Sequence, residues 1–181
     1  MTCGQSGMFY SPIIVLIVVL DQVTKYLCVK YIDYGTVGIE VFSFFNLVHV
    51  YNHGAAFSFL SDMGGWQRWF FIAVAVIISI LFVVMLRKTS RSHCFLCLSY
   101  VLFVGGAIGN LIDRLYLGYV IDFLLFYWRF DDGVWAYPAF NVADISVSVG
   151  AFLLIVCTIF GRDHTAGSGD EGDAGAEKAK D

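Results

Sequence analysis

Three short stretches of the chain place polar and ionisable side chains within sequence that is otherwise apolar. The stretches are residues 105–114, 120–123 and 140–144, and they contain Asn110, Asp113, Arg114, Asp122, Asn141 and Asp144. Ionisable groups are costly inside a bilayer, so a functional site is the first hypothesis where they occur in apolar sequence. These side chains are therefore the candidates for a functional site.

Asp122 and Asp144 are the carboxylates that we expect to work as a pair. Two carboxylates that are close together in a site of low dielectric cannot both ionise easily, so one keeps its proton. The protonated group can donate to a carbonyl oxygen while the ionised group takes a proton from water, as in aspartic proteases. Spacing alone leaves two alternatives open: proton-coupled transport, and a structural role in which Asp113 pairs with Arg114 and Asp144 caps a helix.

Nucleophilic and metal-dependent chemistries find less support in the sequence. No histidine lies within 105–144 to act as a base for a serine or cysteine nucleophile. Cys94 and Cys97 form a Cys-x-x-Cys pair beside His93, but a zinc site needs about four ligands and no second pair lies at a suitable spacing. We interpret these cysteines as small apolar helix residues. The sequence predicts neither a metal nor another cofactor.

The composition is that of a polytopic membrane protein. Of the 181 residues 59% are hydrophobic and 14% are charged, with a mean hydropathy of +0.74, whereas soluble domains carry about 25% charge. The net charge of -4 is uneven, because residues 162–181 hold six acidic and three basic side chains. Nowhere do basic residues form the stripe that nucleic acids require, so we expect no nucleic-acid partner.

Four apolar stretches have the roughly 20-residue length of a membrane-crossing helix. They are residues 11–31, 67–87, 94–116 and 140–160. Three basic side chains in the loop at 87–91 favour a cytoplasmic location for that loop. Both termini would then be cytoplasmic, with segments 32–64 and 117–139 on the outer face. We predict one membrane domain over 1–161 and a disordered acidic cytoplasmic tail over 162–181.

The two outer segments have different compositions. Residues 41–51 are rich in β-branched and aromatic side chains, which predicts a short hairpin or sheet on the membrane surface. Asn52 and Gly54 follow, in a pattern that suits a tight turn. Segment 117–139 is strongly aromatic and indicates a short surface helix or loop at headgroup level. The predicted fold class is an all-α membrane protein with four transmembrane helices and a small extracytoplasmic β-sheet.

Asp21 and Lys25 are the charged side chains of the first span. They are four residues apart and therefore lie on one face of a helix. One interpretation is an ion pair near the outer interface, with Lys25 extending toward water. The other is a role at the functional site, since a further turn or two of helix follows Asp21.

Five short motifs of polar and small residues follow one another along the chain. They are Asp21-Gln22-Val23-Thr24-Lys25, the stretch from Asn52 to Phe57, the stretch from Gly105 to Arg114, Val120-Ile121-Asp122-Phe123, and the stretch from Phe140 to Asp144. In this order and on these spans, the sequence closely resembles the bacterial lipoprotein signal peptidases, or signal peptidase II, a family of aspartic membrane peptidases. The resemblance extends over nearly the whole membrane part.

The resemblance implies that Asp122 and Asp144 are the catalytic pair. It also implies that other side chains line or support the pocket, namely Asp21, Lys25, Asn52, Gly54, Asn110, Asp113, Arg114 and Asn141. The implied substrates are prolipoproteins whose cysteine already carries diacylglyceryl, cut just before that cysteine. The outer sheet would form a cradle on the periplasmic side of the inner membrane. Membrane lipids and globomycin-type peptide inhibitors are the other implied partners, and we expect a monomer.

Two rival functions and one departure accompany this interpretation. A small proton-coupled carrier would need inverted repeats or carboxylates spread across the membrane depth. A non-enzymatic adaptor would give no reason for paired aspartates beside asparagine and arginine.

The segment from Leu124 to Ala139 is a few residues longer than the family pattern, and this difference bears on how the substrate reaches the site.

Overall fold

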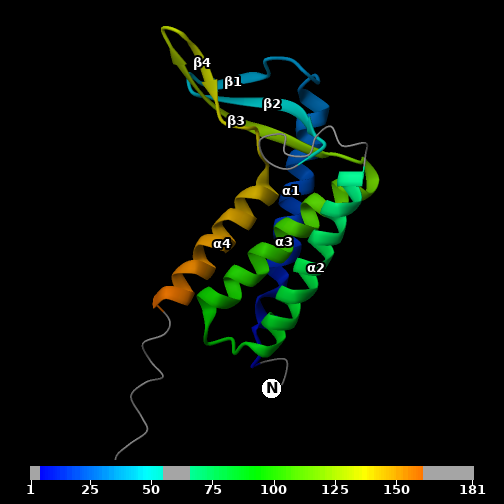
Figure 1. Ribbon diagram of the computed structural model, residues 1–181, viewed down its shortest axis with the longest axis vertical. Coiled ribbons are helices and arrows are strands. Elements are labelled where there is room, and N and C mark those ends of the chain that lie inside the picture. The colour runs from blue at the N-terminus through cyan, green and yellow to red at the C-terminus, as the bar shows by residue number, and fades with distance from the viewer. Residues whose placement is uncertain (1–4, 55–65, 161–181) are drawn as a thin grey trace, which may run out of the picture.

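A computed structural model of the chain describes residues 5–54 and 66–160, and all structural statements below concern these residues. Four long helices form a bundle, and a small sheet covers one end of it (Figure 1). The helices are α1 (Ser11–Tyr31), α2 (Trp66–Lys88), α3 (Cys94–Tyr116) and α4 (Val142–Phe160), preceded by a short 3-10 helix, η1 (Gly7–Tyr10).

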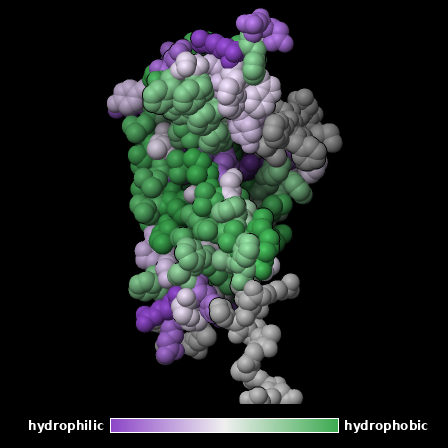
Figure 2. All heavy atoms as spheres, turned by 90° about the vertical axis from the view of Figure 1, so that its left-hand side faces the viewer, coloured by the Kyte–Doolittle hydropathy of each residue, from purple (hydrophilic) through white to green (hydrophobic). Residues whose placement is uncertain are grey.

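Each of the four helices is long and apolar enough to cross a membrane. Many of their large apolar side chains are exposed, as expected for helices whose outer surfaces contact lipid tails rather than water. Figure 2 shows the resulting apolar belt, with hydrophilic residues gathered toward the two ends of the molecule. The helix bounds lie within two residues of the spans predicted from the apolar stretches. The predicted tail at 162–181 lies outside the described residues.

Helix α3 packs against each of the other three helices. At the end of the bundle away from the sheet, Cys97 and Val101 are fully buried and pack with Phe82 and Leu86 of α2. Cys97 therefore behaves as an apolar packing residue, while Cys94 is exposed at the start of α3. Among the described residues, no three His, Cys, Asp or Glu side chains gather in a way that could hold a metal ion.

The sheet has four antiparallel strands in the order β1-β2-β3-β4. They are β1 (Ile39–Phe42), β2 (Phe45–Asn52), β3 (Val120–Phe130) and β4 (Gly133–Ala136). The predicted hairpin in the first outer segment is confirmed as β1 and β2. The second outer segment was expected to form a surface helix or loop and instead supplies β3 and β4. Strand β3 pairs with β2, whose residues lie 68 to 81 positions earlier (Asn52 with Val120, Phe45 with Phe126), an association that local sequence does not reveal.

Glycines bring α3 close to α1 and α4. A Cβ added at Gly106 would overlap the carbonyl oxygen of Ala143, and one added at Gly109 would lie 2.7 Å from Oδ2 of Asp21. Because no flexible side chain could yield at Gly106, α3 and α4 can approach this closely only with glycine there. The small residues thus set the separation of two helices that carry site residues.

We expect Gly106→Ala to lower both stability and activity, because α4 would have to move away from α3. Overpacking of this kind costs about 1–3 kcal/mol of unfolding free energy, measurable by thermal unfolding in detergent. Gly150→Ala is a graded control, since its added Cβ would lie 3.0 Å from the carbonyl oxygen of Ser99. An effect at Gly106 no larger than that at Gly150 would contradict the close-approach argument.

Candidate active site

The carboxyl groups of Asp122 and Asp144 come from two different elements. Asp122 lies near the start of β3 and is 2% exposed. Asp144 lies in the first turn of α4. The backbone N–H of Asp144 donates to Oδ1 of Asn141 at 2.9 Å, and the N–H of Asn141 donates to Oδ2 of Asp144 at 3.2 Å. This reciprocal exchange is a capping box, and it holds Asp144 at the helix start.

Three asparagine amides donate to the two carboxylates. Asp122 accepts from Nδ2 of Asn141 at 2.7 Å and from Nδ2 of Asn52 at 2.9 Å. Asp144 accepts from Nδ2 of Asn110 at 2.8 Å. Nδ2 of Asn141 also lies 3.1 Å from Oδ1 of Asn110. The two carboxylates are therefore joined through a network of amides from α3, β2 and the segment before α4.

The orientation of the key amides follows from partners that can only donate. The Lys25 ammonium donates to Oδ1 of Asn110 at 3.0 Å, and this turns Nδ2 of Asn110 toward Asp144. The backbone N–H of Asp144 occupies Oδ1 of Asn141, so Nδ2 of Asn141 faces Asp122. Both amides thus present donors to the carboxylates and stabilise a negative charge on them.

Lys25 lies in a buried charge cluster under the site. Its ammonium is 2.8 Å from Oδ2 of Asp21 and 2.9 Å from Oδ2 of Asp113. The three side chains are at most 3% exposed. The interpretation in which Lys25 extends toward water is therefore wrong, because α1 packs this face against α3.

The two aspartates of this cluster also hold the backbone beside the paired carboxylates. Oδ1 of Asp21 accepts the N–H of Ala143 at 2.9 Å. Oδ2 of Asp113 accepts the N–H of Ile121 at 3.1 Å. Ala143 and Ile121 immediately precede Asp144 and Asp122, so the cluster fixes the chain at both positions.

Arg114 does not neutralise Asp113, whose ion-pair partner in the described residues is Lys25. The Arg114 guanidinium instead contacts the carbonyl oxygens of Gly54 at 3.3 Å and Asn110 at 3.4 Å. It also lies over the Phe71 ring, 5.0 Å from its centroid. The N–H of Gly54 donates to Oδ1 of Asn52 at 3.0 Å, which forms the predicted turn. The rest of that motif, from Ala55 to Phe57, lies outside the described residues.

The pKa of Asp122 is raised to about 7, mainly by burial and in addition by the negative charge of Asp144. The hydrogen bonds from Asn52 and Asn141 and the charge of Lys25 act in the opposite direction and lower the pKa. The neutral form of Asp122 is therefore well populated near neutral pH, and the amides of Asn52 and Asn141 stabilise the ionised form when it forms.

A cavity of about 590 Å³ opens beside Asp144 and runs along the helices. Its upper wall, at the sheet end of the bundle, carries polar groups of Asn52, Asn110, Arg114 and Asp144. Its lower wall is apolar and consists of small or branched side chains from α2, α3 and α4, among them Val74, Ala75, Ile78, Ala107 and Val147. In Figure 2 hydrophilic residues are visible in a recess of the apolar belt below the sheet. The cavity can hold an apolar chain with a polar group at its upper end.

Comparison with known proteins identifies the family. A family profile described as signal peptidase (SPase) II matches residues 13–160. The chain belongs to the signal peptidase II family. This result confirms the resemblance drawn from the five motifs.

Several signal peptidase II relatives align over most of this chain. A lipoprotein signal peptidase of Aeromonas hydrophila is 49% identical over 156 residues, which cover 86% of this chain and 91% of that protein. One from Pseudoalteromonas atlantica is 46% identical over 160 residues, which cover 88% and 94%. A solved bacterial membrane enzyme superposes with a TM-score of 0.73 at 30% identity, covering 93% of this chain and 98% of its own. A four-helix fold with a small sheet is thus shared with solved structures.

Family membership does not favour the proton-coupled carrier. In this signal peptidase II chain, Asp21, Asp113, Asp122 and Asp144 gather at the sheet end of the bundle rather than across its depth. A proton relay across a membrane would also need ionisable groups in the half of the bundle that lies away from the sheet. The protein is a bacterial membrane protein with a compact polar site at one end.

Two parts of the site were not predicted from the sequence. Nε2 of Gln22 donates to Oδ1 of Asp113 at 2.9 Å and to the Gly109 carbonyl oxygen at 3.2 Å. The position of Gln22 next to Asp21 in the first motif is the feature of the sequence that could have indicated this role. Residues 137–140 form a wall of the cavity, and their aromatic and proline content gave no such indication.

Proposed function

We propose that Asp122 and Asp144 are the catalytic pair of an aspartic endopeptidase that removes signal peptides from prolipoproteins. The observation that supports this most is that amide donors hold both carboxylates and that Asp144 lies at the polar end of an apolar cavity. The substrate would be a prolipoprotein whose cysteine carries diacylglyceryl. The cut would fall just before that cysteine.

The proposed reaction uses one water molecule and one shared proton. The ionised carboxylate takes a proton from water, and the hydroxide oxygen bonds to the carbonyl carbon of the residue before the cysteine. The protonated carboxyl gives its proton to the carbonyl oxygen, and a tetrahedral intermediate forms. When this intermediate collapses, the carbon–nitrogen bond breaks, the cysteine nitrogen takes up a proton from the pair, and one hydroxyl of the intermediate returns a proton to the pair. The pair titrates as a unit, so the proton belongs to both aspartates.

The charges around the pair favour a single shared proton. With Asp21, Asp113, Asp122 and Asp144 all ionised, Lys25 and Arg114 would leave this buried region two negative charges in excess. One proton on the catalytic pair halves that excess. Arg114, held between Gly54 and the Phe71 ring, is placed to contact a substrate carbonyl or lipid headgroup.

The substrate would enter sideways from the bilayer. The apolar lower wall of the cavity, between α2 and α4, suits the signal-peptide helix and the acyl chains. We place the protein in the bacterial inner membrane, with both termini cytoplasmic and the site toward the periplasm. The basic loop from Arg87 to Arg91 at the other end of the bundle supports this orientation.

The test is cleavage of a synthetic diacylglyceryl-modified prolipoprotein by the purified protein in detergent. We expect one cut before the cysteine, located by mass spectrometry, and inhibition by a globomycin-type peptide. A chelator should leave the rate unchanged, and light scattering should report a monomer. Uncut substrate would refute the proposed function, and inhibition by the chelator would refute its metal-free chemistry.

The pH dependence of cleavage should report the loss of the shared proton from the pair. The pKa of Asp122, raised to about 7, indicates that the pair holds this proton below about pH 7 and loses it above, so kcat/KM should fall as pH rises through about 7. The Asn52 amide lowers this pKa by stabilising the ionised form. Asn52→Leu should therefore move the descending limb to higher pH, besides lowering the rate. A limb that stays in place or moves to lower pH would contradict the assignment.

A further inference from the structure

The far end of the β3–β4 hairpin extends beyond the rest of the sheet. Pairing between β2 and β3 ends at Phe126, and residues 127–130 of β3 pair with β4. Figure 1 shows this two-stranded arm projecting from the sheet on the side away from the helices. A two-stranded ribbon has little stability of its own in water. Large apolar side chains exposed on it therefore call for a binding role.

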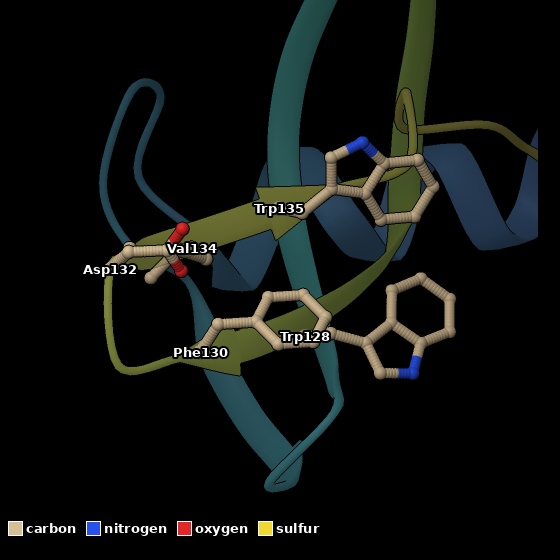
Figure 3. A pocket seen from close by; sticks show the side chains of 6 residues that line it. Trp128, Phe130, Asp132, Val134 and Trp135 are labelled. Carbon is tan, nitrogen blue, oxygen red and sulfur yellow. The ribbon is translucent and has the colours of Figure 1, made fainter.

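Three aromatic side chains cover one face of the arm. Trp128 is 45% exposed, Trp135 is 53% exposed and Phe130 is 62% exposed. The two indoles belong to paired residues, and their ring centroids are 5.2 Å apart. Figure 3 shows both indoles projecting to the same side of the strands. The arm lines a hollow of about 700 Å³ that includes these three side chains.

The aromatic face of the arm continues toward the cavity through Phe126. Side chains alternate along a strand, and β3 pairs with β4 without a break from Tyr127 to Phe130, so Trp128 and Phe130 share one face of the arm. Two residues before Trp128 lies Phe126, whose ring stacks on Phe140 with centroids 6.0 Å apart. Phe140 lines the cavity beside Asp144, so an aromatic surface extends from the cavity wall out to the arm.

The arm also continues directly into the wall of the cavity. Beyond β4, the N–H of Tyr137 donates to the Phe126 carbonyl oxygen at 2.9 Å, and the N–H of Phe140 donates to that of Leu124 at 3.0 Å. Residues 137–140 therefore run beside β3, and they line the cavity next to Asp144. A polypeptide leaving the carboxylate pair on the sheet side would pass this strip and reach β4.

The tip of the arm does not suit a bilayer. The turn there carries Asp131 and Asp132, both exposed. Anionic lipid headgroups would repel these carboxylates. The arm also points away from the helices that define the apolar belt (Figure 1). A polypeptide outside the membrane fits this surface better than lipid does.

We propose that the aromatic face of the β3–β4 arm binds the segment of the prolipoprotein that follows the lipid-modified cysteine. This proposal rests on the proposed function. Among the described residues β4 pairs with β3 alone, so an extended peptide can add to its other edge through backbone hydrogen bonds. Backbone pairing and contact with aromatic rings depend little on sequence. Such recognition suits an enzyme whose substrates differ after the cysteine.

Two substrates of different length test the proposal. Both carry the same signal sequence and diacylglyceryl cysteine, but one ends about three residues after the cysteine and the other about fifteen. The path along β3 from Asp122 to Phe130 is about 26 Å, which fifteen extended residues exceed and three do not reach. The wild-type protein should cleave the longer substrate with about tenfold higher kcat/KM.

The double variant Trp128→Ala/Trp135→Ala should abolish this preference and leave cleavage of the short substrate unchanged. Phe130→Ser should reduce the preference in part. The conservative double variant Trp128→Phe/Trp135→Phe should retain most of it. Tyr116→Ala, an 83% exposed aromatic outside the sheet, is the matched control and should change neither rate.

The outcomes separate this proposal from the proposed function. A wild-type protein that cuts both substrates equally well refutes the role of the arm and leaves the peptidase intact. Equal losses on both substrates in the tryptophan variant would show a structural role and also refute it. If the wild-type protein cleaves neither substrate, the proposed function itself fails.

Discussion

Replacing Asp122 or Asp144 by asparagine should lower the rate of signal-peptide cleavage by at least about a thousandfold, because each change removes one partner of the acid–base pair. An amide can neither hold the shared proton nor take one from water. The side-chain size is kept, so the fold should survive. The measurement is single-turnover cleavage of a diacylglyceryl-modified prolipoprotein in detergent.

Binding of the substrate should persist in both variants, since the apolar cavity is unchanged. A fluorescent, uncleaved substrate should therefore bind with nearly the wild-type Kd. Asp33→Asn is the matched control, because Asp33 is an exposed carboxylate that follows α1 outside the site and the arm, and it should retain full activity. Full activity in either Asp122→Asn or Asp144→Asn would rule out a two-carboxylate mechanism.

The helices could be predicted from the sequence because their signal is local. Each span is a predominantly apolar stretch of bilayer length, and the helix ends lie close to where that stretch ends. Strand β3 was missed for the converse reason. Its first four residues are all buried and its last three, Trp128, Arg129 and Phe130, are all exposed, so it shows no alternation. Its identity as a strand comes from pairing with β2, which lies far away in the sequence.

The residues of the site could be collected from the sequence, but their pairing could not. Asp113 and Arg114 are adjacent in sequence and look like an ion pair, yet neighbours on a helix point in different directions. Asp113 pairs with Lys25 of another helix instead. The burial of Lys25 likewise depends on which face α1 turns toward α3. That Asp122 and Asp144 act as catalysts came from the motifs, and it stays a prediction until it is tested.

Replacing Lys25 by methionine should destabilise the protein by about 3–5 kcal/mol, because it leaves two buried carboxylates without their cation. Asp21 and Asp113 are 2.8 Å and 2.9 Å from the ammonium and almost fully buried. The measurement is the midpoint of thermal or denaturant unfolding in detergent. Lys30→Met is the matched control, since Lys30 is exposed on the same helix, and it should shift stability by less than about 0.5 kcal/mol.

The same change should reduce cleavage in the protein that remains folded. Without the ammonium, Oδ1 of Asn110 loses the donor that orients it, so its amide no longer has to face Asp144. The aspartates that hold the N–H groups of Ile121 and Ala143 would repel one another, and the backbone beside both catalytic carboxylates would shift.

Adding Asp113→Asn to Lys25→Met should restore part of the lost stability, because it removes one uncompensated charge while its amide oxygen can still accept from Ile121. Activity should recover less than stability does, since Asn110 would still lack its ammonium partner. Losses that simply add in the double variant would mean that Lys25 and Asp113 act independently. In that case the buried cluster could not be what positions the catalytic pair.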